Sequence, residues 1–395
     1  FKRTGEQCMV RPMKGTIQRG PYPAEDERLK QFLQGDAKNR SENVMIVDLL
    51  RNDLGRICTP GTVTTRSLFD IETYETLHQM TSTIIGHLPR ATKIEPLFRA
   101  LFPCGSVTGA PKIRTMEIIH ELESGVRGVY TGAIGFIAPS GEATFNVPIR
   151  TIELNGSKGE MGIGSGIIHE SDPEQEWREC LLKGCFLSDP APAFSLIETM
   201  LWQPGEGYWL LSEHLERLAA SAAYFRYPFD QPKLMARLDR LTLDFGASPM
   251  RVRLALARDG RTELAPTPCA APAAITWPMP QAALSALPRV TFSNQATDPS
   301  SPWLFHKTTL RELYDSERQQ ALAGGFYEVL FTNTRGEVTE GSISNIFVQQ
   351  QGSLLTPAME CGLLPGVFRR HLLEHAPLPV REAILTRRDL EQAEA

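Results

Sequence analysis

The sequence predicts an α+β protein made of two consecutive domains. Its 395 residues exceed the roughly 250–300 that one hydrophobic core supports. A helical pattern from Pro173 to Leu187 stops at Asp189-Pro190-Ala191-Pro192, where the prolines interrupt regular structure. Helix-like and strand-like periodicities occur on both sides of this break. We therefore expect one domain at residues 1–188 and a second at residues 189–395.

In the first domain we expect two further helices and a meander of strands. The helices are Glu42–Leu54, largely buried, and Pro111–Glu123, which has a proline in its first turn. Alternating residues and Pro-Ser-Gly and Asn-Gly turns predict the strands Tyr130–Ala138, Thr144–Leu154 and Glu160–Ile168.

In the second domain the clearest signals are a helix from Ser212 to Phe225 and a strand from Arg251 to Ala257. A helix should follow Lys307, a hairpin should turn at Thr334-Arg335-Gly336, and another helix should begin just after Leu364-Pro365-Gly366.

Composition narrows the functional classes. An apolar share of 42% and a charged share of 22% are typical of a globular protein. No apolar run approaches the roughly 20 residues that span a bilayer, and Phe1-Lys2-Arg3 does not begin a signal peptide, so we expect a cytoplasmic protein. A net charge of −5 without a basic stripe argues against nucleic acid as a partner. The seven scattered cysteines form no CxxC pair and are expected to be reduced.

Acidic side chains on two helices suggest a cation site. Glu176 and Glu179 share one face of their helix, and Lys183 lies one turn beyond Glu179. Glu42 is a charge among Val44–Val47 and therefore needs a partner or a metal ion. Taken alone, the acidic face of the later helix favours simple exposure to solvent over a cation site, and the motifs around it reverse that preference.

Four motifs in this half carry a specific resemblance. They are Arg11-Pro-Met-Lys-Gly-Thr16, Glu42-Asn-Val-Met-Ile-Val-Asp-Leu-Leu-Arg-Asn-Asp53, Gly105-Ser-Val-Thr-Gly-Ala-Pro-Lys112 and Pro148-Ile-Arg-Thr151. Together they resemble the chorismate-utilising enzymes over nearly all of residues 1–187. The resemblance implies a magnesium ion that is held by Glu42 and Glu179, with Glu176 close by. It also implies a substrate site made by His78, Thr108, Arg150, the backbone amides of Gly164 and Gly166, and Lys183.

Lys14 distinguishes between branches of that family. In the anthranilate synthases this motif looks like Pro-x-Ala-Gly-Thr, with alanine at the position of Lys14. The aminodeoxychorismate synthases have lysine at that position, as this chain does. A desolvated lysine near a metal site loses its proton readily and can act as a nucleophile. Our hypothesis is that Lys14 attacks C2 of chorismate while the C4 hydroxyl leaves, after which ammonia adds at C4 and Lys14 departs.

The second half resembles the fold type IV pyridoxal-phosphate enzymes, among them the 4-amino-4-deoxychorismate lyases. The matching stretches are His214-Leu-Glu-Arg-Leu218, Phe305-His-Lys-Thr-Thr309, Val338-Thr-Glu-Gly-Ser-Ile-Ser-Asn-Ile-Phe347 and Leu364-Pro-Gly366. The resemblance implies that Lys307 is the cofactor lysine and that Glu340 pairs with the ring nitrogen of the cofactor. It further implies that Arg217 and the amides of Val367 and Phe368 bind the phosphate, as a helix N-terminus can. Arg251 and Arg253 are both candidates for the substrate carboxylate.

Together the two resemblances imply a bifunctional enzyme that makes 4-aminobenzoate from chorismate and ammonia. An anthranilate synthase segment joined to an aminotransferase, and a non-catalytic scaffold with both folds, are the alternatives. The first family implies a glutamine amidotransferase as partner, and the second allows a homodimer through the cofactor domain. Both families extend beyond this sequence, so we expect a chorismate domain truncated before Phe1, where a Ser-Pro-Glu stretch supplies an acid/base, and a cofactor domain truncated after Ala395.

Overall fold

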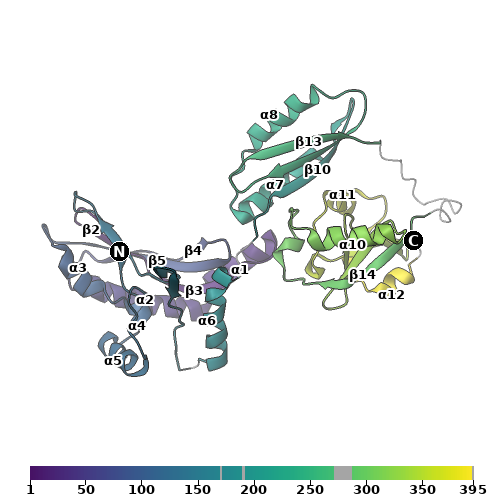
Figure 1. Cartoon of the computed structure of the whole chain (residues 1–395). Coiled ribbons are helices and arrows are strands. Elements are labelled where there is room, and N and C mark those ends of the chain that lie inside the picture. The colour runs from purple at the N-terminus through teal and green to yellow at the C-terminus, as the bar shows by residue number, and fades with distance from the viewer. Residues whose placement is uncertain (170, 189–191, 271–286, 394–395) are drawn as a thin grey trace. The chain divides into compact units, whose positions relative to one another are not determined.

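The computed structural model describes residues 1–169, 171–188, 192–270 and 287–393. These residues form two compact units, each a mixture of helices and strands, which confirms the predicted α+β class (Figure 1). The first unit comprises Phe1–Arg19 and Glu27–Pro192, and the second comprises Gly20–Asp26 and Ala193–Ala395. The expected boundary between residues 188 and 189 adjoins residues 189–191, which lie outside the described residues.

An antiparallel sheet of seven strands forms the centre of the first unit, in the order β3-β5-β2-β1-β7-β6, with β4 paired to β5. The strands are β1 (Lys2–Thr4), β2 (Gln7–Val10), β3 (Met13–Gln18), β4 (Thr64–Thr73), β5 (Leu77–His87), β6 (Ile134–Ile137) and β7 (Ala143–Asn146). The hairpin of β8 (Ile152–Asn155) and β9 (Lys158–Met161) is a separate sheet. Strand β5 is paired with three others, β2, β3 and β4, all antiparallel to it.

Helix α2 (Ala37–Gly55) packs against this sheet and contributes Ile46, Leu50 and Leu54 to the core. It begins where Asp36 caps the amide of Asn39, as short acidic side chains do at helix starts. The other helices of the unit are the greater part of α1 (Pro23–Gly35), whose first four residues belong to the second unit, and α3 (Ile94–Leu101), α4 (Gly105–Thr108), α5 (Lys112–Leu122) and α6 (Pro173–Ser188). The three predicted helices of this half are confirmed within a few residues.

Three details of the first half were predicted incorrectly. Val44 and Met45 are exposed, so only one face of α2 is apolar and buried. The expected strand Thr144–Leu154 is two strands, β7 and β8, because Pro148 cannot donate a ladder hydrogen bond and Arg150 adopts a left-handed backbone with a φ of 52°. The last expected strand ends early at Met161 and continues as an irregular segment.

The second unit contains a four-stranded antiparallel sheet in the order β11-β10-β12-β13, against which two helices pack. Its elements are β10 (Leu196–Gln203), β11 (Gly207–Tyr208), α7 (Leu211–Phe225), α8 (Gln231–Thr242), β12 (Met250–Leu256) and β13 (Thr262–Pro268). Leu215 and Leu218 of α7 and Leu234 of α8 share a core with Val252 and Leu254 of β12. These elements confirm the predicted helix and strand of this region.

Two three-stranded sheets, β14-β15-β16 and β17-β18-β19, complete the second unit. The elements are β14 (Val290–Thr297), η1 (Pro302–Leu304), α10 (Glu312–Ala323), β15 (Glu328–Asn333), β16 (Val338–Gly341), β17 (Val348–Gln350), β18 (Ser353–Pro357), η2 (Met359–Cys361), α11 (Val367–His375), β19 (Val380–Ala383) and α12 (Arg387–Glu391). The predicted hairpin turn and the two later helices are confirmed. Throughout the described ranges, every helix is too short or too polar to cross a lipid bilayer.

Candidate active sites

Lys14 lies at a β-bulge, which sets its orientation. The pairing of β3 with β5 shifts register between Met13 and Thr16, and Gly15 between them has a φ of 100° that side-chain-bearing residues rarely adopt. A bulge of this kind redirects the side chains beside it. The buried amide of Asn43 donates to the carbonyl oxygen of Lys14 over 3.0 Å, so α2 holds the bulge in place.

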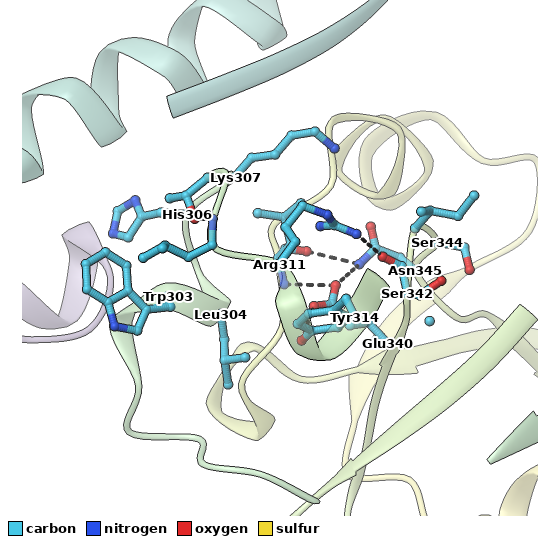
Figure 2. Close-up of a pocket in the computed structure, with 15 residues that line it drawn as sticks. Trp303, Leu304, His306, Lys307, Arg311, Tyr314, Glu340, Ser342, Ser344 and Asn345 are labelled. Carbon is cyan, nitrogen blue, oxygen red and sulfur yellow. Dashed lines mark hydrogen bonds between the residues drawn. The ribbon is translucent and has the colours of Figure 1, made fainter. Parts of the chain in front are cut away.

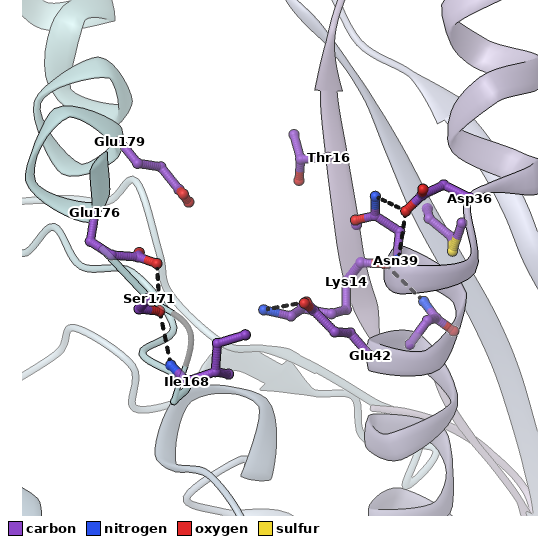
Figure 3. A network of polar contacts seen from close by, with 12 residues as sticks. Lys14, Thr16, Asp36, Asn39, Glu42, Ile168, Ser171, Glu176 and Glu179 are labelled. Carbon is purple, nitrogen blue, oxygen red and sulfur yellow. Dashed lines mark hydrogen bonds and ion pairs between the residues drawn. The ribbon is translucent and has the colours of Figure 1, made fainter. Parts of the chain in front are cut away.

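The amine of Lys14 faces acidic groups from two helices. Its Nζ lies 3.1 Å from Oε2 of Glu42 on α2. Glu176 and Glu179, on α6, point toward this pair from the opposite side (Figure 3). Nζ of Lys183 lies 2.6 Å from Oε1 of Glu179, one helical turn away. The cluster therefore contains two lysines and three glutamates.

The segment between β9 and α6 carries its backbone close to the same amine. A Cβ atom added to Gly166 would lie 3.3 Å from Nζ of Lys14. Lys183 donates to the carbonyl oxygen of Gly164 over 3.0 Å. Glycine at both positions leaves the main chain accessible, as an anionic substrate bound by backbone amides requires.

Electrostatics keep Glu176 ionised. Hydrogen bonds from Ser165 and Ser171, and then the charges of Lys183 and Lys14, hold the pKa of its carboxyl below the usual value. Among the described residues, no three His, Cys, Asp or Glu side chains gather closely enough to hold a metal ion. A divalent cation at this cluster would have to displace the lysines that pair with Glu42 and Glu179.

The other three side chains expected at this site, those of His78, Thr108 and Arg150, lie on separate elements and differ in burial and hydrogen bonding. His78 is buried on β5, and its Nδ1 shares a hydrogen bond with Oγ1 of Thr73 at 3.0 Å. Thr108 ends α4 and donates to the carbonyl oxygen of Cys104 over 3.1 Å. Arg150 is exposed in its left-handed turn. The contacts described for these three residues do not tie them to Lys14.

In the second unit, Lys307 and Glu340 line one pocket (Figure 2). The pocket is bounded by residues of η1 and of the segment from there to Arg311, by Tyr314 of α10, by residues 340–345 at and after the end of β16, and by Leu364. Within the described residues, no hydrogen bond holds the amine of Lys307. It is therefore free to react with a molecule that enters the pocket.

Burial shifts both ionisable groups of the pocket. It lowers the pKa of Lys307 to about 8, with help from the positive charge of Arg217. It raises the pKa of Glu340 to about 7, even though the amide of Leu364 and the hydroxyl of Tyr314 donate to its carboxylate over 3.1 and 3.0 Å. A lysine with this pKa is neutral in a substantial fraction of molecules near neutral pH, which a nucleophile or base requires.

Arg217 lies beside the start of α11. Its Nη1 donates to the carbonyl oxygen of Pro365 over 3.1 Å, and α11 begins at Val367 without a side-chain cap. A Cβ atom on Gly366 would lie 1.9 Å from Oδ1 of Asn345, so only glycine allows this close approach. Uncapped first-turn amides and a guanidinium group at one helix end favour an anion such as phosphate.

The sequence did not reveal several residues that shape the two sites. Asn43 donates a hydrogen bond to the backbone of Lys14 and lies next to Glu42 in the Glu42–Asp53 motif. A polar residue on this helix, which was expected to be largely buried, was the one sequence feature that could have indicated its role. Glu198 and Tyr314 carry no local pattern, because their partners Arg217 and Glu340 lie far away in the sequence. Arg251 and Arg253 occupy the same exposed face of β12 and do not contribute to the described pocket wall.

A buried, readily deprotonated lysine opposite a buried carboxylate is typical of enzymes that work through a covalently bound amine. Two family models match the chain in succession, chorismate binding enzymes over residues 1–189 and class IV aminotransferases over residues 195–395. Because the second match covers half of the sequence, the chain belongs to the class IV aminotransferase family. That family implies a pyridoxal phosphate cofactor.

Individual relatives match one half at a time. The aminodeoxychorismate synthase of Streptomyces pristinaespiralis is 49% identical over 173 residues, or 44% of this chain and 24% of that protein. The anthranilate synthase component 1 of Streptomyces coelicolor is 44% identical over 182 residues, 46% of this chain and 36% of that protein. The chain thus spans only 24% to 36% of the length of these curated relatives. A solved structure from Mesorhizobium loti, named provisionally as an amino-acid aminotransferase, is 38% identical, covering 51% of this chain and 92% of its own, with a TM-score of 0.46.

The residues of the pocket are chemically suited to the cofactor that the family implies. Lys307 and Glu340 would supply an amine for its aldehyde and a buried carboxylate for its ring nitrogen. Arg217, beside the start of α11, would supply a cationic end for its phosphate. All of these groups belong to the second unit.

Proposed function

We propose that this chain makes 4-aminobenzoate from chorismate, first replacing the C4 hydroxyl of chorismate by an amino group and then eliminating pyruvate. The observation that carries the proposal is that one chain combines Lys14, paired with Glu42, and Lys307, which shares a pocket with Glu340. Lys14 is the residue of the first pair that favours amination at C4 over the anthranilate reaction. The second pair supplies the amine chemistry for the elimination.

In the first reaction, Lys14 is the proposed nucleophile. Its Nζ forms a bond to C2 of chorismate as the bond between C4 and its hydroxyl breaks, and ammonia then bonds to C4 as Lys14 departs. Glu42 holds the amine in place at 3.1 Å. Gly164 and Gly166 would present backbone amides, and Arg150 and Lys183 positive charges, to the two carboxylates of the substrate.

We propose that Mg²⁺ is held by Glu42 and Glu179 with Glu176 close by. Carboxylate oxygens are the ligands that Mg²⁺ prefers, and Glu176 has a lowered pKa that keeps it ionised. The lysines beside Glu42 and Glu179 suggest that metal and lysine compete for these carboxylates. The metal would neutralise the ring carboxylate of the substrate and orient it.

In the second reaction, Lys307 is the proposed base. Bound pyridoxal phosphate supplies an electron sink for the C–H bond to be broken. The Nζ of Lys307 takes the proton from C4 of aminodeoxychorismate, and the ring becomes aromatic as the enolpyruvyl oxygen leaves with pyruvate. Glu340 keeps the cofactor nitrogen protonated, while Arg217, Val367 and Phe368 bind the phosphate. No amino acceptor is needed for this outcome, in contrast to an aminotransferase.

The proposal includes partners and a location. Ammonia would come from a glutamine amidotransferase, because the first reaction consumes an amino group that chorismate lacks. We also propose a cytoplasmic location and a homodimer formed through the cofactor-binding unit.

Product analysis tests the proposal. Purified protein is incubated with chorismate, ammonium, Mg²⁺ and pyridoxal phosphate, and products are separated by liquid chromatography with mass detection. We expect 4-aminobenzoate and pyruvate in equal amounts. Anthranilate fluorescence without 4-aminobenzoate would instead favour the alternative of an anthranilate synthase joined to an aminotransferase. Accumulation of aminodeoxychorismate alone would retain the first reaction and refute the second.

A further inference from the structure

Glu198 of β10 is a buried carboxylate with no assigned role, and it binds Arg217 through both oxygens. Nε of Arg217 donates to Oε1 over 2.8 Å and Nη2 donates to Oε2 over 2.6 Å. The side chain of Glu198 is only 2% exposed. A bidentate pair of this kind fixes the plane of a guanidinium group as well as its position.

The same carboxylate has a second partner, His214, which makes its third contact. Nδ1 of His214, one turn before Arg217 on α7, lies 2.7 Å from Oε2 of Glu198. Burial by itself would raise the pKa of Glu198, but Arg217 and then His214 hold it below the usual value. Glu198 is therefore an anion inside the protein, and Arg217 is its principal counter-ion.

Three of the N–H bonds of the Arg217 guanidinium group are occupied within the protein. A guanidinium group carries five N–H bonds, of which two bind Glu198 and one binds the carbonyl oxygen of Pro365. Within the described residues, one N–H on Nη1 and one on Nη2 have no other acceptor. Nη1, which donates to Pro365, is the part of Arg217 next to the start of α11.

Glu198 is also linked to Lys307 through the main chain. The amide of Ile197, its neighbour, donates to the carbonyl oxygen of Lys307 over 2.8 Å, and the amide of Thr309 donates to the carbonyl oxygen of Ser195 over 3.0 Å. The start of β10 thus pairs with the segment that carries the cofactor lysine. One short stretch of backbone therefore positions both that lysine and the carboxylate that orients Arg217.

We infer that Glu198 is a positioning residue for the phosphate end of the cofactor, because it holds Arg217 in the orientation that presents its two remaining N–H bonds beside α11. This inference rests on the proposed cofactor site. The negative charge of Glu198 also partly offsets the lowering of the Lys307 pKa by Arg217. Without that charge, Lys307 should lose its proton at a lower pH.

Ligands with and without a phosphate group separate this role from general stability. Dissociation constants for pyridoxal phosphate and for pyridoxal are measured by absorbance on wild-type protein and on Glu198→Gln. We expect the pyridoxal phosphate constant to rise roughly tenfold, the size of effect found when the partner behind a ligating side chain is removed, and the pyridoxal constant to change little. The ratio of the two constants is independent of how much of the variant is folded.

A matched control is Glu216→Gln, also on α7, which removes an exposed ion pair with Arg370 of α11. It should leave both constants unchanged. If Glu198→Gln does not fold, Glu198→Asp, which retracts the carboxylate by one methylene while keeping its charge, is measured in the same way and should also lower the preference for the phosphate.

Three results would overturn the inference. An unchanged ratio in the Glu198 variants would mean that Arg217 needs no positioning. A tighter complex of Glu198→Gln with pyridoxal phosphate would mean that Glu198 merely competes with phosphate for Arg217. Wild-type protein that binds neither ligand, or binds equally well after Lys307→Ala, would remove the cofactor site itself, a failure of the proposed function that these comparisons distinguish from the first two results.

Discussion

Nζ of Lys14 lies 3.1 Å from Oε2 of Glu42, at a bulge that Gly15 makes possible. Both the amine and the backbone of Lys14 have fixed partners, because the buried Asn43 also donates to its carbonyl oxygen. The ion pair connects the strand that carries the proposed nucleophile to the helix that carries a proposed metal ligand. The first prediction follows from this pair.

Lys14→Ala should lower the rate of aminodeoxychorismate formation by on the order of 10³-fold, because no other group replaces the attacking amine. The rate is measured by mass detection with ammonium as nitrogen source. Conversion of added aminodeoxychorismate to 4-aminobenzoate should be unaffected. Lys158→Ala, at an exposed position of β9, is the control and should behave as wild type. Undiminished amination by Lys14→Ala would refute the nucleophile role.

Glu179→Gln should raise the Mg²⁺ concentration needed for half-maximal amination by roughly 10–100-fold, the range reported for residues that support a metal. The change removes a charge that now pairs with Lys183 on α6. Glu174→Gln is the matched control, because it also breaks an ion pair between residues four apart on α6, but with the exposed Arg178. Equal Mg²⁺ requirements for the two variants would place the metal elsewhere.

Attachment of pyridoxal phosphate to Lys307 should increase as pH rises through about 8. Burial lowers the pKa of Lys307 to that value, and only the neutral amine above it attacks an aldehyde. Because the negative charge of Glu340 raises this pKa, Glu340→Gln should shift the midpoint to lower pH. The rate is followed by absorbance between pH 6 and 10 with Glu360→Gln, an exposed change, as control. A midpoint near the ordinary lysine value would contradict the burial argument.

Glu328→Gln should loosen the loop that follows Glu340. The buried carboxylate of Glu328 accepts the amides of Ser342 and Ile343, each over 3.2 Å, and the hydroxyl of Ser344 over 2.9 Å. An amide side chain cannot accept all of these bonds, so the free energy of unfolding should fall by about 2 kcal/mol. Hydrogen exchange should accelerate at residues 342–344. Unchanged protection there would show that the loop is held by other contacts.

Sequence patterns predicted the local elements well because periodicity and turn residues act over short distances. The turn at Thr334-Arg335-Gly336 and the helix after Gly366 were confirmed for this reason. The strand expected at Thr144–Leu154 failed because periodicity does not register the break that Pro148 and the left-handed Arg150 cause. Prolines and positive φ values must be weighed against an alternating pattern.

In the candidate sites, too, short-range patterns were informative and long-range contacts were not visible in the sequence. Motifs brought Lys14, Glu42, Lys307 and Glu340 to attention one by one, but only tertiary contacts show which residues fix them. The pairing of Arg217 with Glu198 joins a helix to a strand, and no sequence spacing expresses such a pairing. Buried carboxylates of this kind are therefore the part of a site that a single sequence reveals least.

The most direct test of the account is the location of the bound cofactor. Protein incubated with pyridoxal phosphate is reduced with borohydride, which fixes the cofactor to the amine that holds it, and is then digested and mapped by mass spectrometry. We expect a pyridoxyl group on Lys307 and none after Lys307→Ala. Absence of this label from the wild-type protein, or its retention on another lysine in the variant, would contradict the assignment of Lys307.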